Sequence, residues 1–139
     1  MRENHNNALY KCAIVDDDLQ FMFLLSTYVK QVSKLQLAGT YLDPQVAMDS
    51  ISEEDNIDFL FLDIRMGNIS GVDVAAYLRD KVKFIVFVSG SSEYALDALQ
   101  VGGDQYLLKP IPFSTFLTTI NGLLARQRTS KQLNSITSG

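Results

Sequence analysis

Several features are scarce or absent in this chain of 139 residues, and each scarcity excludes a class of protein. The single cysteine, Cys12, rules out an intramolecular disulfide. Because Cys12 lies inside an apolar run, we expect a buried thiol rather than a reactive one. No apolar run approaches the roughly 18 residues that a membrane helix needs, and the first residues lack the pattern of a secretion signal. The sequence therefore predicts a cytoplasmic protein with no membrane association.

Positive charge is also in short supply. Lysine and arginine number 12 against 16 acidic residues, which gives a formal net charge of -4. This balance argues against a nucleic-acid-binding surface, so any contact with DNA would need a domain absent from this chain. The single histidine, His5, lies on a polar stretch and is expected to be inert.

Apolar runs of strand length alternate with stretches of helical periodicity. Near-continuous apolar strands, each followed by a helix, imply an α/β fold with a parallel sheet covered on both faces. Asp18 occupies the N-cap position of the first helix, and the cluster 21–23 is expected to be core. The expected strands span residues 12–15, 35–42, 57–62, 83–88 and 105–108, and the expected helices span about 19–34, 44–52, 71–80, 93–101 and 112–126.

The end of the chain differs in composition from the rest. From about residue 126 onward serine, threonine and asparagine predominate, which predicts a linker or a frayed tail. The folded domain is expected to span residues 8–127, and the polar linker or tail residues 128–139. A single domain of this length can bury a core without a disulfide or a structural metal.

Polar side chains stand at the ends of four of the expected strands. Asp16 and Asp17 follow the first strand, Asp63 the third, Ser89 the fourth and Lys109 the fifth. Parallel strands end at one edge of a sheet, and doubly wound sheets bind ligands there, at the topological switch point. The sequence therefore predicts a site that combines carboxylates, a hydroxyl and an ammonium group.

These groups suit one kind of chemistry. Clustered carboxylates repel one another, so they share a proton or hold a divalent cation. Mg²⁺ prefers oxygen ligands and commonly binds a phosphate oxygen beside a few carboxylates. A lysine and a serine hydroxyl can bind phosphoryl oxygens, and an aspartate can be the nucleophile. The prediction is a Mg²⁺-dependent phosphoryl site.

Four segments at the strand ends resemble the receiver domain of two-component response regulators, and their order and spacing agree over about residues 10–126. The resemblance implies a doubly wound, five-stranded parallel sheet of the flavodoxin-like type, with strand order 2-1-3-4-5 and five helices. Two further segments, 94–99 and 106–111, resemble receivers of the LytTR (LytR/AlgR) subgroup of transcription regulators. The four receiver-like segments are 14–18, 61–66, 86–89 and 104–110.

The resemblance also implies a role for each site residue. Asp63 would accept a phosphoryl group from a phosphohistidine of a sensor histidine kinase or a phosphotransfer protein. Asp17 and Asp63 would bind Mg²⁺ together with the backbone carbonyl of Arg65, while Asp16 would act mainly through water and charge. Lys109 would pair with Asp63 before the reaction and with the phosphoryl group after it.

Ser89 and Tyr106 would form the switch of such a domain. The hydroxyl of Ser89 would close on the phosphoryl group while the ring of Tyr106 turns inward, and the Lys109-Pro110 bond would be cis. The fourth helix, the fifth strand and the last helix would then form a homodimer interface or dock an output domain.

Two glycines depart from the usual receiver pattern. Gly67 follows Met66 where receivers commonly carry proline, and Gly90 replaces the usual alanine after the switch hydroxyl. Both glycines are expected to loosen their loops, but neither removes a group that phosphorylation needs. The chain also ends without the DNA-binding domain of the LytTR subgroup, so it is expected to be a piece of a longer protein or a stand-alone receiver.

Two other classes of function remain open. A pseudo-receiver would share the fold and act only as an interaction scaffold. A Mg²⁺-dependent phosphatase of the haloacid dehalogenase type also uses a strand-end aspartate, but it needs a second acid two residues later, where this chain has Arg65. Since every group for phosphorylation is present, we expect a phospho-accepting signalling domain and not an enzyme.

Overall fold

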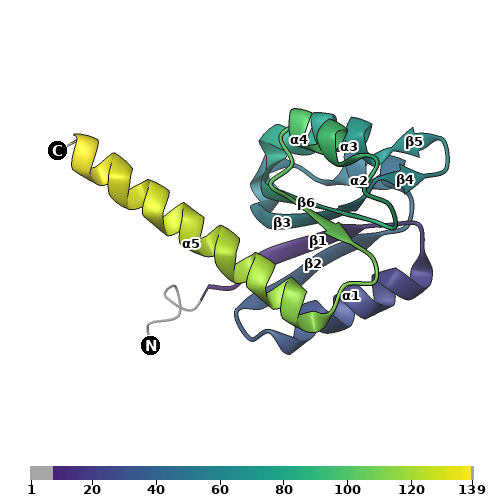
Figure 1. The fold of residues 1–139 in the computed structure, drawn as a ribbon, viewed down its shortest axis with the longest axis horizontal. Coiled ribbons are helices and arrows are strands. Elements are labelled where there is room, and N and C mark those ends of the chain that lie inside the picture. The colour runs from purple at the N-terminus through teal and green to yellow at the C-terminus, as the bar shows by residue number, and fades with distance from the viewer. Residues whose placement is uncertain (1–7, 139) are drawn as a thin grey trace.

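The computed structural model describes residues 8–138, with side chains up to Thr129; His5 lies outside the described residues. A parallel sheet of five strands forms the centre of the molecule (Figure 1). The strands are β1 (Tyr10–Val15), β2 (Leu35–Tyr41), β3 (Ile57–Asp63), β6 (Val82–Ser89) and β7 (Gln105–Leu108). Their order, β2-β1-β3-β6-β7, confirms the expected order 2-1-3-4-5.

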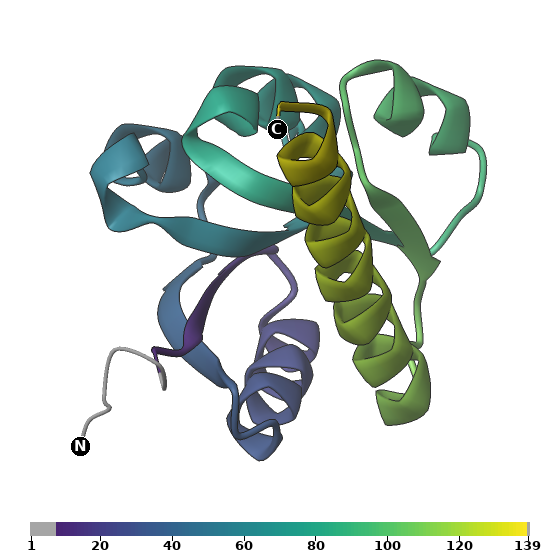
Figure 2. The same ribbon diagram turned by 90° about the vertical axis from the view of Figure 1, so that its left-hand side faces the viewer.

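Helices cover both faces of the sheet, as Figure 2 shows from the side. They are α1 (Leu19–Gln31), α2 (Pro44–Ser50), α3 (Gly71–Leu78), α4 (Ala95–Gln100) and α5 (Phe113–Ser138). Helices α1 and α5 bury one cluster of apolar side chains against the sheet, and α2, α3 and α4 bury a second cluster on the other face. Short 3-10 turns at Glu53–Asp55 and Arg79–Lys81 lead into β3 and β6.

The central strand β3 shows why both faces need cover. Phe59 and Phe61 belong to the cluster under α1 and α5, whereas Leu60 and Leu62 belong to the opposite cluster, and all four are fully buried. Successive side chains of a strand point to opposite faces, so an unbroken apolar run fits only a sheet covered on both sides. The run delivers Asp63 to the sheet edge as its last residue.

The N-terminus of α1 is fixed by Asp18, whose side chain accepts hydrogen bonds from the N–H groups of Gln20 and Phe21 at 3.0 and 3.3 Å. This confirms Asp18 as the N-cap. Phe21 and Met22 are buried, but Phe23 is 74% exposed, so the expectation of a core cluster over 21–23 is wrong for Phe23. Two residues along a helix turn the side chain by about 200°, away from the sheet.

Cys12 lies in β1 and is fully buried, as expected. Burial, aided by the nearby carboxylate of Asp58, raises the pKa of the thiol to about 12. The thiol therefore stays protonated at neutral pH and behaves as a small apolar side chain.

Helix α5 continues well beyond the point where the composition becomes polar. It is helical through Ser138 and projects away from the sheet (Figure 1). Residues 128–138, which were expected to form a linker or a frayed tail, are thus helical. No glycine or proline interrupts the chain between Leu123 and Ser138, so no residue of the strongest helix-breaking types ends the helix earlier. The domain boundary at residue 127 stays a prediction. No helix within residues 8–138 has the length and apolar character needed to cross a membrane.

A small hairpin follows Asp63 and was not foreseen. Its strands β4 (Arg65–Met66) and β5 (Ile69–Ser70) pair antiparallel outside the main sheet. Gly67 has a φ of 54°, a left-handed conformation that glycine adopts at little cost and that tight hairpin turns require. The loop that Gly67 was expected to loosen is instead closed by strand pairing.

Candidate functional site

Three carboxylates meet at the C-terminal edge of the sheet. Asp16 and Asp17 follow β1, and Asp63 ends the neighbouring strand β3, where Val15 and Leu62 lie side by side in the register. One oxygen from each of the three acids lies within 4.8 Å of the others. The structure thus brings together the acids that the sequence placed at these strand ends.

Asp16 is fully buried, yet only half of its carboxylate is satisfied. Its Oδ1 accepts a hydrogen bond from the N–H of Asp18 at 2.8 Å. Its Oδ2 forms an ion pair with the Lys109 ammonium at 2.9 Å but has no hydrogen-bond partner within the described residues. A buried carboxylate oxygen left in this state can interact with a cation or with a water bound to one.

Asp63 is 6% exposed and has only distant donors. The N–H of Arg65 lies 3.4 Å from its Oδ1, and the Lys109 ammonium lies 3.7 Å from its Oδ2. Burial and, to a smaller extent, the charge of Asp16 raise the pKa of Asp63 to about 6, although Lys109 and the Arg65 N–H act in the opposite direction. The carboxylate is thus held in a surrounding that disfavours its charge unless a cation approaches.

Lys109 reaches this cluster from the end of β7. Its N–H donates to the Ser89 carbonyl at 2.8 Å, and the Lys109-Pro110 bond is cis, which confirms the expectation. Beyond its two carboxylate neighbours, the ammonium also lies 4.3 Å from the centre of the Phe21 ring. Phe21 had been assigned only to the core.

The two residues expected to form the switch, Ser89 and Tyr106, both contact Ser91, in the loop between β6 and α4. Ser89 is 2% exposed, and its Oγ accepts a hydrogen bond from the N–H of Ser91 at 3.2 Å. The hydroxyl of Tyr106 donates to the Ser91 carbonyl at 2.5 Å. The backbone of Ser91 therefore links the two side chains.

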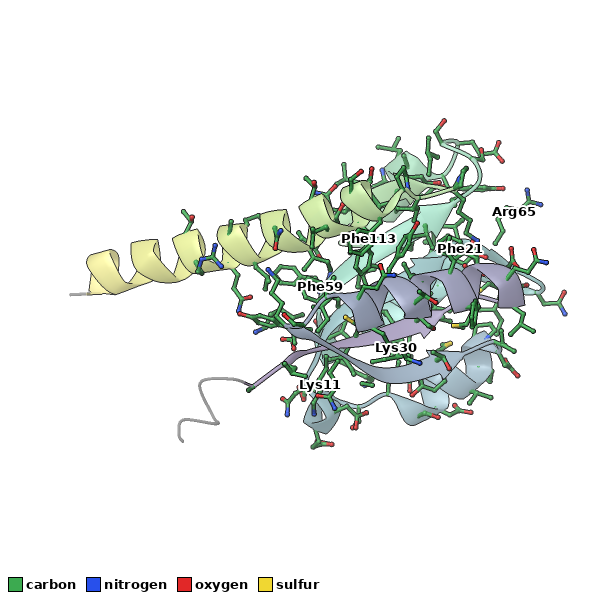
Figure 3. The ribbon with its side chains drawn as sticks, turned by 90° about the horizontal axis from the view of Figure 1, so that it is seen from below. Lys11, Phe21, Lys30, Phe59, Arg65 and Phe113 are labelled. Carbon is green, nitrogen blue, oxygen red and sulfur yellow. The ribbon has the colours of Figure 1, made fainter. Side chains whose placement is uncertain are left out.

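Arg65 lies at the rim of the site. Its side chain is exposed and stands at the edge of the molecule (Figure 3). Its N–H is the group that faces Asp63, and the role of its carbonyl as a metal ligand stays a prediction.

Gly71 is a site neighbour to which the sequence analysis gave no role beyond the start of a helix. A Cβ at this position would lie 2.1 Å from the carbonyl oxygen of Asp63, and the N–H of Gly71 donates to the Ile64 carbonyl at 2.7 Å. No residue with a side chain fits there without moving the backbone of Asp63. A serine N-cap followed by glycine, Ser70-Gly71, was the only local signal.

A doubly wound sheet that brings three carboxylates, a lysine and a buried hydroxyl to one edge has the architecture of a receiver domain. A family model described as "Response regulator receiver domain" matches residues 12–121, and the chain belongs to this family. It is accordingly a signalling domain and not an enzyme.

Curated relatives agree with this assignment. The chain is 32% identical over 127 residues to the transcriptional regulatory protein BtsR of Escherichia coli (strain K12), covering 89% of this chain and 51% of that protein. It is 29% identical over 126 residues to the nisin biosynthesis regulatory protein NisR of Lactococcus lactis subsp. lactis, covering 88% and 54%. The chain thus spans about half the length of these relatives.

Solved structures share the fold over most of the chain. The response regulatory domain of mrkE from Klebsiella pneumoniae superposes with a TM-score of 0.76 at 25% identity, covering 86% of this chain and 98% of that one. A CheY-like receiver from Methanospirillum hungatei JF-1 gives a TM-score of 0.77 at 20% identity, covering 88% and 99%. The second likeness concerns the fold alone.

Proposed function

We propose that this chain is a phospho-accepting receiver and that Asp63 takes the phosphoryl group. The observation that carries the proposal is the position of the Asp63 carboxylate, buried at the end of β3 beside two further acids and a lysine. In the reaction, an oxygen of Asp63 attacks the phosphorus of a phosphohistidine. The P–N bond breaks, the histidine leaves, and an acyl phosphate forms on Asp63.

The acidic cluster fits Mg²⁺. Asp17 and Asp63 would hold the ion with the carbonyl of Arg65. Asp16 would act through a bound water, which suits its buried Oδ2, an oxygen that pairs with Lys109 but accepts no hydrogen bond within the described residues. When bound, Mg²⁺ supplies positive charge that lowers the repulsion between the acids and an incoming phosphoryl group.

The remaining groups act once Asp63 is modified. Lys109 pairs with a phosphoryl oxygen, and Ser89 donates its hydroxyl to another. Movement of Ser89 would then shift Ser91, because the Ser91 N–H donates to Ser89 and the Ser91 carbonyl accepts from the hydroxyl of Tyr106. Through this link the phosphoryl group would act on the ring of Tyr106 and turn it inward.

The output surface is the face formed by α4, β7 and α5. Three leucines on it, Leu96, Leu99 and Leu108, are more than half exposed. They support a homodimer interface or a docking surface for an output domain. Phosphorylation would change the affinity of this face for its partner by about 1–3 kcal/mol.

The proposed receiver function also indicates the partners of this chain. The phosphodonor would be a sensor histidine kinase or a phosphotransfer protein. Membership of the LytTR subgroup is supported by segments 94–99 and 106–111, and transcription regulation is supported by relatives named as transcriptional regulators. DNA would be bound by a domain outside this chain, in the cytoplasm.

Incubation with radiolabelled acetyl phosphate tests the proposal. We expect Mg²⁺-dependent labelling of the wild type, no labelling of Asp63→Asn, and normal labelling of Asp73→Asn, a matched change at an exposed residue of α3. Label that persists in Asp63→Asn would place the acceptor elsewhere. A wild type that takes no label from acetyl phosphate or from histidine kinases would favour the pseudo-receiver.

A further inference from the structure

Phe21 is a core residue whose ring faces the charged group of the site, Lys109. It lies in the first turn of α1, is 7% exposed, and has the Lys109 ammonium 4.3 Å from its ring centre. A cation within about 6 Å of an aromatic face is attracted by the negative charge of the ring, and the attraction grows as water is excluded. The Lys109 side chain is only 20% exposed, so much of the water has been removed.

The segment that supplies Asp16 also supplies Phe21. Asp16 accepts a hydrogen bond from the N–H of Asp18, and Asp18 in turn accepts one from the N–H of Phe21. These bonds tie the carboxylate that follows β1 to the first turn of α1. One short stretch of chain therefore presents both a carboxylate and an aromatic ring to the same ammonium.

Helix α1 also holds the loop that carries Lys109. Tyr28 lies two turns after Phe21 and therefore on the same face of α1. Its hydroxyl donates to the Ile111 carbonyl at 2.7 Å, and its ring packs edge-on against Phe113 with 5.2 Å between centres. Phe21 belongs to the apolar cluster that α1 and α5 bury against the sheet, and Phe113 packs against the same cluster. The segment from Lys109 to Phe113 is thus held by contacts at both ends of this face of α1.

We propose that Phe21 is a positioning residue for phosphoryl transfer, whose ring keeps the Lys109 ammonium in the site while the ammonium exchanges a carboxylate partner for a phosphoryl oxygen. The proposal rests on the proposed function of Asp63. A hydrogen bond would be lost when the ammonium shifts, but the attraction to a ring face is weakly directional and persists through a small movement. A leucine at position 21 would fill the core without offering this attraction.

The contact itself can be tested without metal or phosphodonor. In the NMR spectrum of the metal-free wild type, the Cε protons of Lys109 should be shifted upfield by the ring current of Phe21. Phe21→Leu should return them to their ordinary position, and Phe21→Tyr, which keeps the ring, should retain the shift. Unshifted Lys109 protons in the wild type would overturn the proposal.

The effect on the reaction is tested by fluorinating the ring, which drains negative charge from its face with little change of shape. Phenylalanines with one, two and three fluorines are incorporated at position 21. Each added fluorine should lower the rate of labelling by acetyl phosphate and Mg²⁺, with a total decrease of about three- to tenfold. The melting temperature should stay constant. The same series at Phe59, a buried residue farther down β3, is the matched control and should leave the rate unchanged.

The outcomes separate the two proposals. A rate that does not respond to fluorination at position 21, or that falls equally at Phe59, in a protein labelled at Asp63 would overturn the role of Phe21 alone. A wild type without label would overturn the function of Asp63 and the role of Phe21 with it. The NMR shift would then still report whether the ring and the ammonium are in contact.

Discussion

Two aspartates at opposite ends of their strands show how differently a fold can use the same side chain. Asp63 is the last residue of β3, and Asp104 directly precedes β7. Asp104 accepts hydrogen bonds from the Ile85 N–H at 2.8 Å, from Arg79 at 3.1 Å and from Arg126 at 2.7 Å. Asp63 has an N–H at 3.4 Å and an ammonium at 3.7 Å.

The difference lies in how completely each carboxylate is satisfied. The two arginines of Asp104 come from opposite faces of the sheet, Arg79 from the turn after α3 and Arg126 from α5, so its charge is fully used in holding elements together. Asp63 is more deeply buried and less well paired, which costs stability. A buried carboxylate kept in that state indicates a site reserved for a ligand or a reaction.

Replacing Asp104 should have the largest effect on folding. Asp104→Ala leaves the Ile85 N–H without its acceptor and Arg79 without its carboxylate partner, and we expect the free energy of unfolding to fall by about 2–4 kcal/mol. Urea denaturation followed by circular dichroism measures this loss. Labelling by acetyl phosphate, measured well below the melting temperature, should persist; its complete loss in a folded variant would make Asp104 part of the site.

Replacing Asp63 should change stability in the opposite direction. Asp63→Asn removes the buried charge and its repulsion from Asp16, so in metal-free buffer at pH 7 the free energy of unfolding should rise by about 1–2 kcal/mol. Part of the gain is offset because Lys109 loses a partner. The same denaturation measurement decides this, and a variant less stable than the wild type would show that Asp63 is a structural residue like Asp104.

The place of Asp63 in a site could be predicted from the sequence, but the ion pairs of Asp104 could not. Apolar runs locate strand ends, and strand ends in a doubly wound sheet converge, so Asp16, Asp63 and Lys109 followed from pattern alone. The partners Arg79 and Arg126 are 25 and 22 residues away from Asp104 in the chain. No local pattern pairs charged residues over such distances.

The other features that the sequence did not predict also depend on contacts or conformations that no local pattern of residues shows. The contact of Phe21 with Lys109 joins residues from α1 and from the end of β7, and helical periodicity shows only that Phe21 is buried. The hairpin at Gly67 depends on a left-handed φ that several loop conformations share. The sequence over 128–138 has only two large apolar residues, Leu133 and Ile136, so helical periodicity could not detect this part of α5.

The pH dependence of stability should distinguish the two aspartates further. The pKa of Asp63 is about 6 in the folded protein and near its ordinary value of 3.8 when unfolded, so between these values the folded state holds the proton that the unfolded state has lost. The free energy of unfolding should therefore decrease as pH rises from about 4 to about 6, and Asp63→Asn should remove that decrease. Metal-free denaturation across this range is the measurement, and an unchanged slope in Asp63→Asn would contradict the raised pKa.

Mg²⁺ should stabilise the protein through the acidic cluster at Asp63, and Asp104 should have no part in this effect. At a Mg²⁺ concentration ten times the dissociation constant, binding stabilises the folded state by about 1.4 kcal/mol. We expect thermal melting to show this gain in the wild type and in Asp104→Asn, and to show none in Asp17→Ala, which loses an exposed member of the acidic cluster. An undiminished Mg²⁺ response in Asp17→Ala would place the ion elsewhere.

The smallest effect should come from Arg126, the outer partner of Asp104. Its side chain is 54% exposed, whereas that of Arg79 is 26% exposed and also donates to the carbonyls of Gly102, Val82 and Lys83. An ion pair open to water contributes about 0–1 kcal/mol, so Arg126→Gln should lower the free energy of unfolding by less than 1 kcal/mol and Arg79→Gln by more. Arg128→Gln, an exposed change on the same helix, is the matched control. If Arg126→Gln lowered the free energy of unfolding as much as Asp104→Ala, Asp104 would stabilise the fold mainly by its ion pair with α5. Its bonds to Ile85 and Arg79 would then contribute little.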